Sequence, residues 1–201
     1  MTIQKMILIG STSQNSGKTQ FGRELTRRLS QNFPVVVLKV ATVHKKGMPC
    51  VRGKNGCGTC TQFTGDYQLI EERSYTADTD TAKYLKAGAQ KAYLLKCLKS
   101  YLAVAYREFL DLVPEDAFIL CESNSLREVW VPDYFVMLRG RGKGKPSARQ
   151  VMALADQVIK NDYQTDFSSE VDKILTGDKS RRINIPMIKM GRRKESPGAV
   201  R

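Results

Sequence analysis

Residues 10–19 carry the clearest chemical signal in this chain, the run Gly-Ser-Thr-Ser-Gln-Asn-Ser-Gly-Lys-Thr. The run follows an apolar stretch at 6–9 and precedes an amphipathic segment, so the order is strand, loop, helix. A glycine-containing loop that opens a helix points backbone N–H groups and the positive end of the helix dipole at an anion. Lys18 would reach the β- and γ-phosphates of a nucleoside triphosphate, and the Thr19 hydroxyl would hold Mg²⁺. The residues predicted to contact the nucleotide are Gly10, Asn15, Ser16, Gly17, Lys18, Thr19 and Gln20.

The spacing of this loop departs from the pattern G-x-x-x-x-G-K-[ST]. The first glycine would stand at the position of Thr12, and Gly10 lies two residues earlier. A lengthened loop with a wider first turn accommodates the difference, since the coordinating Gly-Lys-Thr end is intact. The alternative is a surface turn followed by a basic helix start. A lysine at a helix N-terminus is disfavoured by the dipole unless an anion is bound there, which favours the phosphate-binding loop.

Acidic residues that could hold Mg²⁺ or orient water follow in two places. Glu122 comes directly after the apolar run 118–121, so it emerges at the carboxyl end of a predicted strand. Asp78 and Asp80 stand just ahead of a predicted helix, for which Asp78 or Thr79 is a plausible cap, so capping alone could explain one of the two acids. We therefore expect Lys18, Asp80 and Glu122 to act in catalysis, and Thr19, Asp80 and Glu122 to bind Mg²⁺.

A second candidate site consists of three cysteines with C-x6-C-x2-C spacing, Cys50, Cys57 and Cys60. Converging thiolates favour Zn²⁺ or an iron–sulfur cluster, and the sequence does not separate the two. The candidates for a fourth ligand are His44, Cys97 and Cys121. The alternative is a set of free or redox-active thiols. Taken alone, the last two cysteines of the chain are more typical of buried apolar residues than of ligands.

The apolar pattern predicts alternating strands and helices. Short continuous apolar runs predict strands at 6–9, 35–40, 92–95, 118–121, 134–138 and 157–159. Helical patterns lie at 17–29, 79–87, 98–113, 148–154 and 168–175. We expect an α/β fold, a P-loop NTPase three-layer αβα sandwich with a mostly parallel sheet and ligands at the carboxyl ends of its strands.

The 201 residues suit a single nucleotide-binding domain over 1–176, with a cysteine-rich insertion at about 41–76 and a basic tail over 177–201. The segment 179–201 holds eight Lys or Arg against one Glu and so carries +7 of the net charge of +13. A second basic run covers 139–145 and could contact an anion. Neither run has interleaved aromatic residues, so we expect no nucleic-acid partner. Without a membrane-spanning stretch or signal peptide, the expected location is the cytoplasm.

The segment Asp80-Thr-Ala-Lys-Tyr-Leu-Lys-Ala-Gly-Ala89 resembles the Asp-Ser/Thr-x5-Ala-Gly-Ala segment of the molybdopterin-guanine dinucleotide biosynthesis protein B (MobB) family. The order of the other parts is similar: an N-terminal Gly-Lys-Thr loop, a strand carrying Lys39 with His44 shortly after, then Asp80, then Glu122. The resemblance covers roughly residues 5–125. The cysteine loop and the Ser-Asn-Ser that follows Glu122 depart from the family pattern.

This resemblance implies a SIMIBI-class P-loop fold and a homodimer that binds GTP with Mg²⁺. It also implies weak GTP hydrolysis and a role in attaching a GMP moiety to molybdopterin, beside a guanylyltransferase partner protein. Asp162, in a Lys-Asn-Asp run, could accept hydrogen bonds from guanine, although an exposed turn is the favoured interpretation of that run.

Two other functions stay open at this point. One is an ATP-dependent synthetase or kinase related to dethiobiotin synthetase, in which the basic run 139–145 would hold an anionic substrate. The other is a nucleotide switch in which the cysteine loop senses or delivers a metal.

Overall fold

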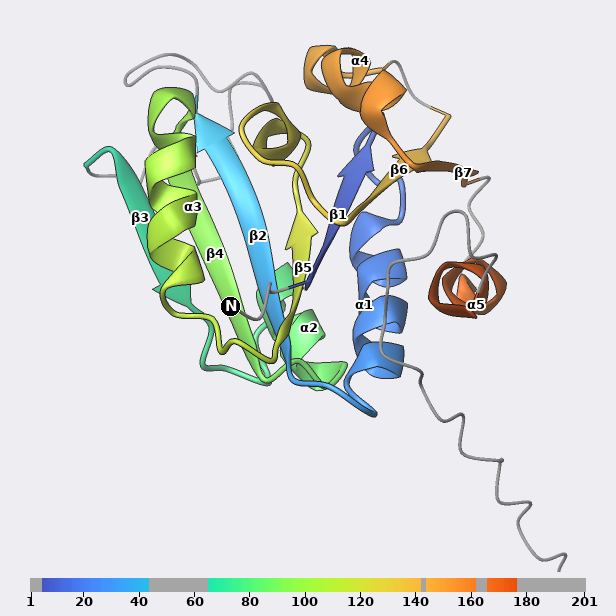
Figure 1. Cartoon of the computed structure of the whole chain (residues 1–201), viewed down its shortest axis with the longest axis horizontal. Coiled ribbons are helices and arrows are strands. Elements are labelled where there is room, and N and C mark those ends of the chain that lie inside the picture. Colours follow the sequence, from blue (N-terminus) through green and yellow to red (C-terminus); the bar gives the residue numbers. More distant parts are fainter. Residues whose placement is uncertain (1–4, 44–64, 142–143, 162–165, 177–201) are drawn as a thin grey trace, which may run out of the picture.

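The computed structural model describes residues 5–43, 65–141, 144–161 and 166–176 (Figure 1). The predicted cysteine site, which consists of Cys50, Cys57 and Cys60, lies outside the described residues. So do His44, Asp162 and the basic tail 177–201.

A seven-stranded sheet forms the centre of the molecule, with strand order β3-β4-β2-β5-β1-β6-β7. Its strands are β1 (Lys5–Ser11), β2 (Val35–Val43), β3 (Tyr67–Glu71), β4 (Lys91–Leu98), β5 (Phe118–Glu122), β6 (Tyr134–Arg139) and β7 (Gln157–Lys160). All neighbouring pairs are parallel except β3 with β4, which is antiparallel. The carboxyl ends of six strands therefore meet at one edge of the sheet, which we call the carboxyl edge.

Helices follow most of the strands and cover both faces of the sheet (Figure 1). The helices are α1 (Lys18–Leu29), α2 (Asp80–Lys86), α3 (Leu102–Leu110), α4 (Pro146–Val151) and α5 (Ser168–Thr176). Three short 3₁₀ segments are η1 (Lys99–Tyr101), η2 (Ser125–Glu128) and η3 (Met152–Leu154).

Two apolar cores result, one on each face of the sheet. Phe21 and Leu25 of α1 pack with Tyr84 of α2 and Val171 of α5 on the first face. Tyr106 and Phe109 of α3 pack on the opposite face, together with Val151 of α4. Side chains of β1 alternate between the two cores, as Ile7 joins the first and Leu8 the second. The α/β fold with a mostly parallel, doubly covered sheet is thus confirmed.

The strand predictions hold for all six apolar runs. The segment 41–76, in which the sequence shows no helical or strand periodicity, nevertheless contains regular structure in its described parts. β2 continues to Val43, and β3 forms an antiparallel edge strand. The continuous apolar runs of the inner strands mark strands that are buried on both faces, whereas β7 at the other edge has Val158 46 % exposed. β3 lies at the edge, where Ile70 is 42 % exposed and no residue is fully buried, so it lacks that signature. Within the described ranges, no helix has the length and apolar character needed to cross a membrane.

Candidate functional site

Strand β1 brings the loop after it to the carboxyl edge, between the ends of two other strands. It pairs with β5 on one side and β6 on the other, with Ile9 opposite Glu122 and Ser11 opposite Leu138. In open α/β sheets, ligands bind beyond the carboxyl ends of strands where connections diverge to opposite sides. The loop at 12–17 lies at such a point.

The N-terminus of α1 has several features that favour negative charge beside it. Gly17 is its N-cap, with φ of +82°, in the left-handed region that favours glycine, and no side chain caps the helix. The first turn contains no acidic residue, and Lys18 is its first residue. The first N–H groups of a helix have no intrahelical acceptor, and the dipole adds partial positive charge there. Negative charge from outside the helix would therefore be stabilised at this end.

Backbone hydrogen bonds hold the start of the loop against the strand end of β6. The Thr12 N–H donates to the Leu138 carbonyl over 3.0 Å, and the Lys145 N–H donates to the Thr12 carbonyl over 2.7 Å. The Gly140 N–H donates to the Thr12 hydroxyl over 3.1 Å. Thr12, which stands where the common pattern has glycine, thus ties the loop to the segment after β6.

Two asparagines fix the rest of the loop. The Asn124 side-chain oxygen accepts the Ser11 N–H over 2.8 Å, and its amide donates to the Ser11 carbonyl over 2.9 Å. The Asn161 amide donates to the Ser16 carbonyl over 2.9 Å. Asn161 is only 7 % exposed, so the turn that begins there is not exposed at this residue. Sequence reasoning missed the structural role of both asparagines.

Two buried polar atoms at this loop have no hydrogen-bond partner among the described residues, Ser16 Oγ and Asn161 Oδ1. Ser16 is 2 % exposed. Most buried polar side-chain atoms in folded proteins are hydrogen-bonded, because an unmet one costs roughly 1–3 kcal/mol. Unpaired atoms of this kind beside an uncapped helix are consistent with a ligand that supplies the missing partners.

Charged side chains converge over the carboxyl ends of β1, β2 and β5. Lys18 Nζ lies 3.6 Å from Glu122 Oε1, and Lys39 Nζ lies 3.8 Å from the same oxygen. The Thr19 hydroxyl donates to Glu122 Oε2 over 3.1 Å. Lys39 also forms an ion pair with Asp80. The structure therefore brings together the predicted residues Lys18, Thr19, Asp80 and Glu122, and adds Lys39.

The electrostatics of Lys18 reflect its surroundings. Burial lowers the pKa of its ammonium, the nearby Lys39 lowers it further, and Glu122 and Asp80 oppose the shift. A second anion, such as a phosphate, would stabilise the charged form in the same way as Glu122 does.

Tyr84 is a further site residue that the sequence did not reveal. Its side chain is fully buried, and its hydroxyl donates to Glu122 Oε2 over 3.2 Å. Gly22 in the middle of α1 makes room for it, since a Cβ there would lie 2.2 Å from the Tyr84 hydroxyl oxygen. A glycine inside a helix is destabilising by roughly 0.5–1 kcal/mol relative to alanine, so its presence was the available signal for a close contact.

The other residues predicted to contact the nucleotide lie in the strand β1, in the loop after it and in the first turn of α1. Gly10 lies inside β1, where a Cβ would come within 2.8 Å of Asn124 Oδ1 and 2.9 Å of the Phe135 ring. Asn15 is exposed and has φ of +52°. Gln20 lies in the first turn of α1. At Gly17, a Cβ would lie 2.5 Å from Asn161 Nδ2, which gives a second reason for glycine.

Cys97 and Cys121 lie in the core of the α3 face, and neither forms a disulfide. Burial raises the pKa of the Cys97 thiol to about 11 and that of Cys121 well above its usual value. Both thiols are therefore protonated at neutral pH, which fits their interpretation as buried apolar residues rather than ligands. In the described part of the chain, no group of three or more His, Cys, Asp or Glu residues is arranged to hold a metal.

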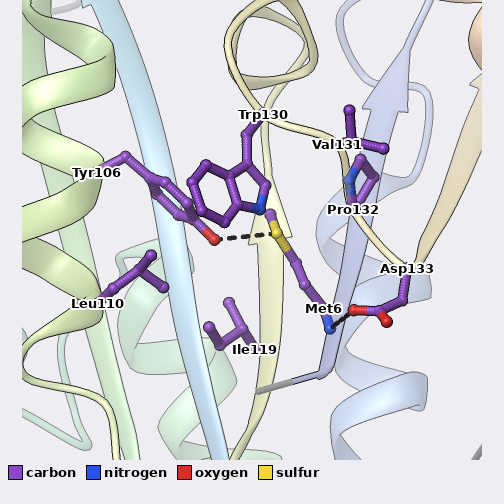
Figure 2. Close-up of a pocket in the computed structure, with 8 residues that line it drawn as sticks. All are labelled: Met6, Tyr106, Leu110, Ile119, Trp130, Val131, Pro132 and Asp133. Carbon is purple, nitrogen blue, oxygen red and sulfur yellow. Dashed lines mark hydrogen bonds between the residues drawn. The ribbon is translucent and has the colours of Figure 1, made fainter. Parts of the chain in front are cut away.

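The edge of the sheet at the amino ends of β1 and β5 is called the amino edge below. A separate apolar hollow of about 250 Å³ lies near it. Figure 2 shows Met6 between Tyr106 of α3 and the segment 130–133. The Tyr106 hydroxyl donates to Met6 Sδ over 3.1 Å, and the Met6 N–H donates to Asp133 Oδ2 over 2.8 Å. The Tyr106 hydroxyl and the Met6 N–H are therefore both hydrogen-bonded within the protein.

Comparison with known proteins does not narrow the class further. No family model matches the chain, and no curated protein and no solved structure matches it. What the structure defines is an α/β protein with a mostly parallel sheet and a charged cluster at the carboxyl edge.

Proposed function

We propose that this chain binds a nucleoside triphosphate together with Mg²⁺ at loop 12–17 and the N-terminus of α1. The observation that carries the proposal is the uncapped start of α1, with left-handed Gly17 followed by Lys18, within reach of Glu122. Triphosphate suits this arrangement because it offers oxygens both to the helix N-terminus and to two lysines.

The residues present fit both groups. Ser16 Oγ is a buried hydroxyl without a partner beside the loop, which a phosphate oxygen could satisfy. The Thr19 hydroxyl and the carboxylates of Glu122 and Asp80 are the hard oxygen ligands that Mg²⁺ prefers. Bound Mg²⁺ would neutralise charge on the terminal phosphates and polarise them toward attack by water.

Each residue then has a definite task. Lys18 binds the terminal phosphates, and Thr19 and Glu122 hold the metal side of the site. Lys39 balances the negative charge of Asp80 and Glu122 before ligand binds. The Tyr84 hydroxyl fixes the orientation of the Glu122 carboxylate by donating a hydrogen bond to it.

Hydrolysis at this site should be slow. Glu122 is engaged by two hydroxyl donors and two ammonium groups, so it is held as a ligand rather than left to deprotonate water. Weak, partner-stimulated hydrolysis suits a protein that reports nucleotide state to another protein.

The narrower proposal is that the nucleotide is GTP and that the chain assists maturation of the molybdenum cofactor. It rests on the resemblance of segment 80–89 and the Gly-Lys-Thr loop to the molybdopterin-guanine dinucleotide biosynthesis protein B family. It is supported to the extent that Asp80 and Glu122 both lie beside Lys39, with Glu122 also beside Lys18. Molybdopterin and a guanylyltransferase are the partners it implies.

Titration calorimetry with GTP and with ATP, each with and without Mg²⁺, tests the proposal on three proteins. These are the wild type, Lys18→Ala, and Lys86→Ala as a control that removes an exposed lysine of α2. We expect Mg²⁺-dependent GTP binding that is lost in Lys18→Ala and retained in Lys86→Ala. Unchanged affinity in Lys18→Ala would contradict the nucleotide site, and a preference for ATP would replace the cofactor-maturation proposal with a synthetase or kinase.

A further inference from the structure

A hollow of about 630 Å³ opens at the ends of β6 and β7, next to the phosphate loop. Its lining includes Thr12, Met152 and glycine backbone, together with the cations Arg139, Arg141 and Lys160. None of its lining residues in the described part of the chain is acidic. We call this space the basic hollow. Its volume falls in the range of roughly 300–1,000 Å³ that is usual for small-molecule sites.

Two of these cations lie side by side because of the pairing of β6 with β7. Arg139 and Lys160 are register partners in the parallel pair of β6 and β7, so their side chains leave the same face of the sheet. Neither forms an ion pair with a carboxylate of the described residues. Like charges that lie directly opposite on neighbouring strands are destabilising. An anion placed between them would remove that repulsion.

The basic hollow lies on a different face of the sheet from the helix N-terminus at Lys18. Leu138 and Ile159 point into the core beneath α1 and α5, so the next residues, Arg139 and Lys160, point to the opposite face. Met152, which lines the hollow, packs against the core on that opposite face. Thr12 belongs both to the loop and to the lining of the hollow, and its peptide and hydroxyl are hydrogen-bonded to Leu138, Gly140 and Lys145.

We propose that the basic hollow binds a second ligand, a small molecule that carries a phosphate group, beside the nucleotide. Concentrated positive charge in a concave space favours a compact anion. Arg139 would supply a planar fork of donors and Lys160 a point charge, a combination suited to phosphate oxygens. None of the described lining residues is aromatic, which argues against a nucleic acid, since nucleic acids are usually held by stacking.

This inference rests on the proposed nucleotide site in one respect, since it takes the phosphate loop to be occupied by another molecule. The test therefore uses Lys18→Ala as a background, in which the loop no longer competes for the probe. Whether the wild type binds nucleotide is decided separately by the GTP titration, so the two proposals can fail independently.

Inorganic pyrophosphate is the probe, titrated by calorimetry into Lys18→Ala and into Lys18→Ala with Arg139→Gln and Lys160→Gln. We expect the added substitutions to weaken pyrophosphate binding by about tenfold or more, because two charge-assisted contacts are lost. A matched control adds Lys86→Gln and Arg107→Gln to the same background, which removes equal charge from exposed positions outside the hollow. The control should bind pyrophosphate as the background does.

Four results would overturn the proposal. The first is no pyrophosphate binding to the Lys18→Ala background, or binding that the substitutions in the hollow leave unchanged. The second is an equal loss in the control, which would show a general effect of net charge. The third is loss of GTP binding when Arg139→Gln and Lys160→Gln are placed in the wild type, since the hollow would then belong to the nucleotide. Tight binding of a single-stranded oligouridylate that depends on the same two residues would also contradict it.

Discussion

The two edges of the central sheet differ in how their polar groups are satisfied. At the amino edge, the Met6 N–H and the Tyr106 hydroxyl each have a partner within the protein (Figure 2). At the carboxyl edge, Ser16 Oγ is buried with no partner in the described ranges, and two lysines lie within 4 Å of the Glu122 carboxylate. Both edges belong to the same sheet.

This difference implies that substitutions at the two edges should have different effects, on folding at one edge and on ligand binding at the other. A paired and apolar edge contributes folding free energy without outside help, so substitutions there should change the free energy of unfolding and little else. An edge with crowded cations and an unmet hydroxyl gains most when a ligand arrives. Substitutions there should change binding more than folding.

The largest expected effect comes from the amino edge. Tyr106 is 1 % exposed and contacts both Phe109 and Trp130 through its ring. Tyr106→Ala should lower the free energy of unfolding by about 3–5 kcal/mol, because it removes a large buried ring and leaves a cavity. Chemical denaturation measures this. Tyr106→Phe, which keeps the ring, should cost at most about 1 kcal/mol. Equal losses in the two variants would contradict the packing argument.

The next effect concerns Glu122 at the carboxyl edge. Glu122→Gln keeps the shape of the side chain but removes the charge that faces the Thr19 hydroxyl and that would face Mg²⁺ in the proposed site. Mg²⁺-dependent GTP hydrolysis should fall by about 100-fold, measured under single-turnover conditions. Glu115→Gln, at an exposed position, serves as the control and should hydrolyse GTP at the wild-type rate. A Glu122→Gln variant with unchanged hydrolysis would remove this carboxylate from the proposed site.

A smaller effect, with an unusual sign, is expected at Gly22. Replacing a helix-interior glycine with alanine normally stabilises a helix by about 1 kcal/mol. Here the added Cβ would meet the buried Tyr84 ring, so Gly22→Ala should instead destabilise the protein by about 1–3 kcal/mol. It should also weaken Mg²⁺-dependent binding, because Tyr84 orients Glu122. Arg23→Ala on the exposed side of α1 should change stability by less than about 0.5 kcal/mol. A stabilised Gly22→Ala would show that the contact does not constrain the site.

The smallest effect is the pH dependence of nucleotide affinity. Burial lowers the pKa of Lys18 in the free protein, and bound phosphate favours its charged form. Below the lowered pKa, Lys18 is already charged and binding takes up no proton. Above it, binding requires proton uptake, so affinity should fall by up to about tenfold per pH unit. Calorimetry in two buffers of different ionisation enthalpy, over about pH 7 to 9.5, measures this uptake. In Lys18→Met, whatever binding remains should show no such uptake.

The sequence allowed much of the fold to be predicted, because strands buried on both faces leave continuous apolar runs. The half-exposed edge strand β3 has no such run and was missed. At the site, Lys18, Thr19, Asp80 and Glu122 were predicted from their positions after strands and before helices. Tyr84 and Asn161 were not, since each contacts a residue far away in the chain, Glu122 and Ser16 respectively. Such contacts depend on strand order, which local patterns do not reveal.

Hydrogen–deuterium exchange with and without Mg²⁺–GTP compares the two edges directly. The account predicts slower amide exchange at residues 12–20, where phosphate would accept N–H groups of the loop and of the start of α1. It predicts no change at residues 129–134 of the amino edge. Protection confined to 129–134, or no protection at 12–20 under saturating nucleotide, would contradict the claim that the carboxyl edge is the ligand site.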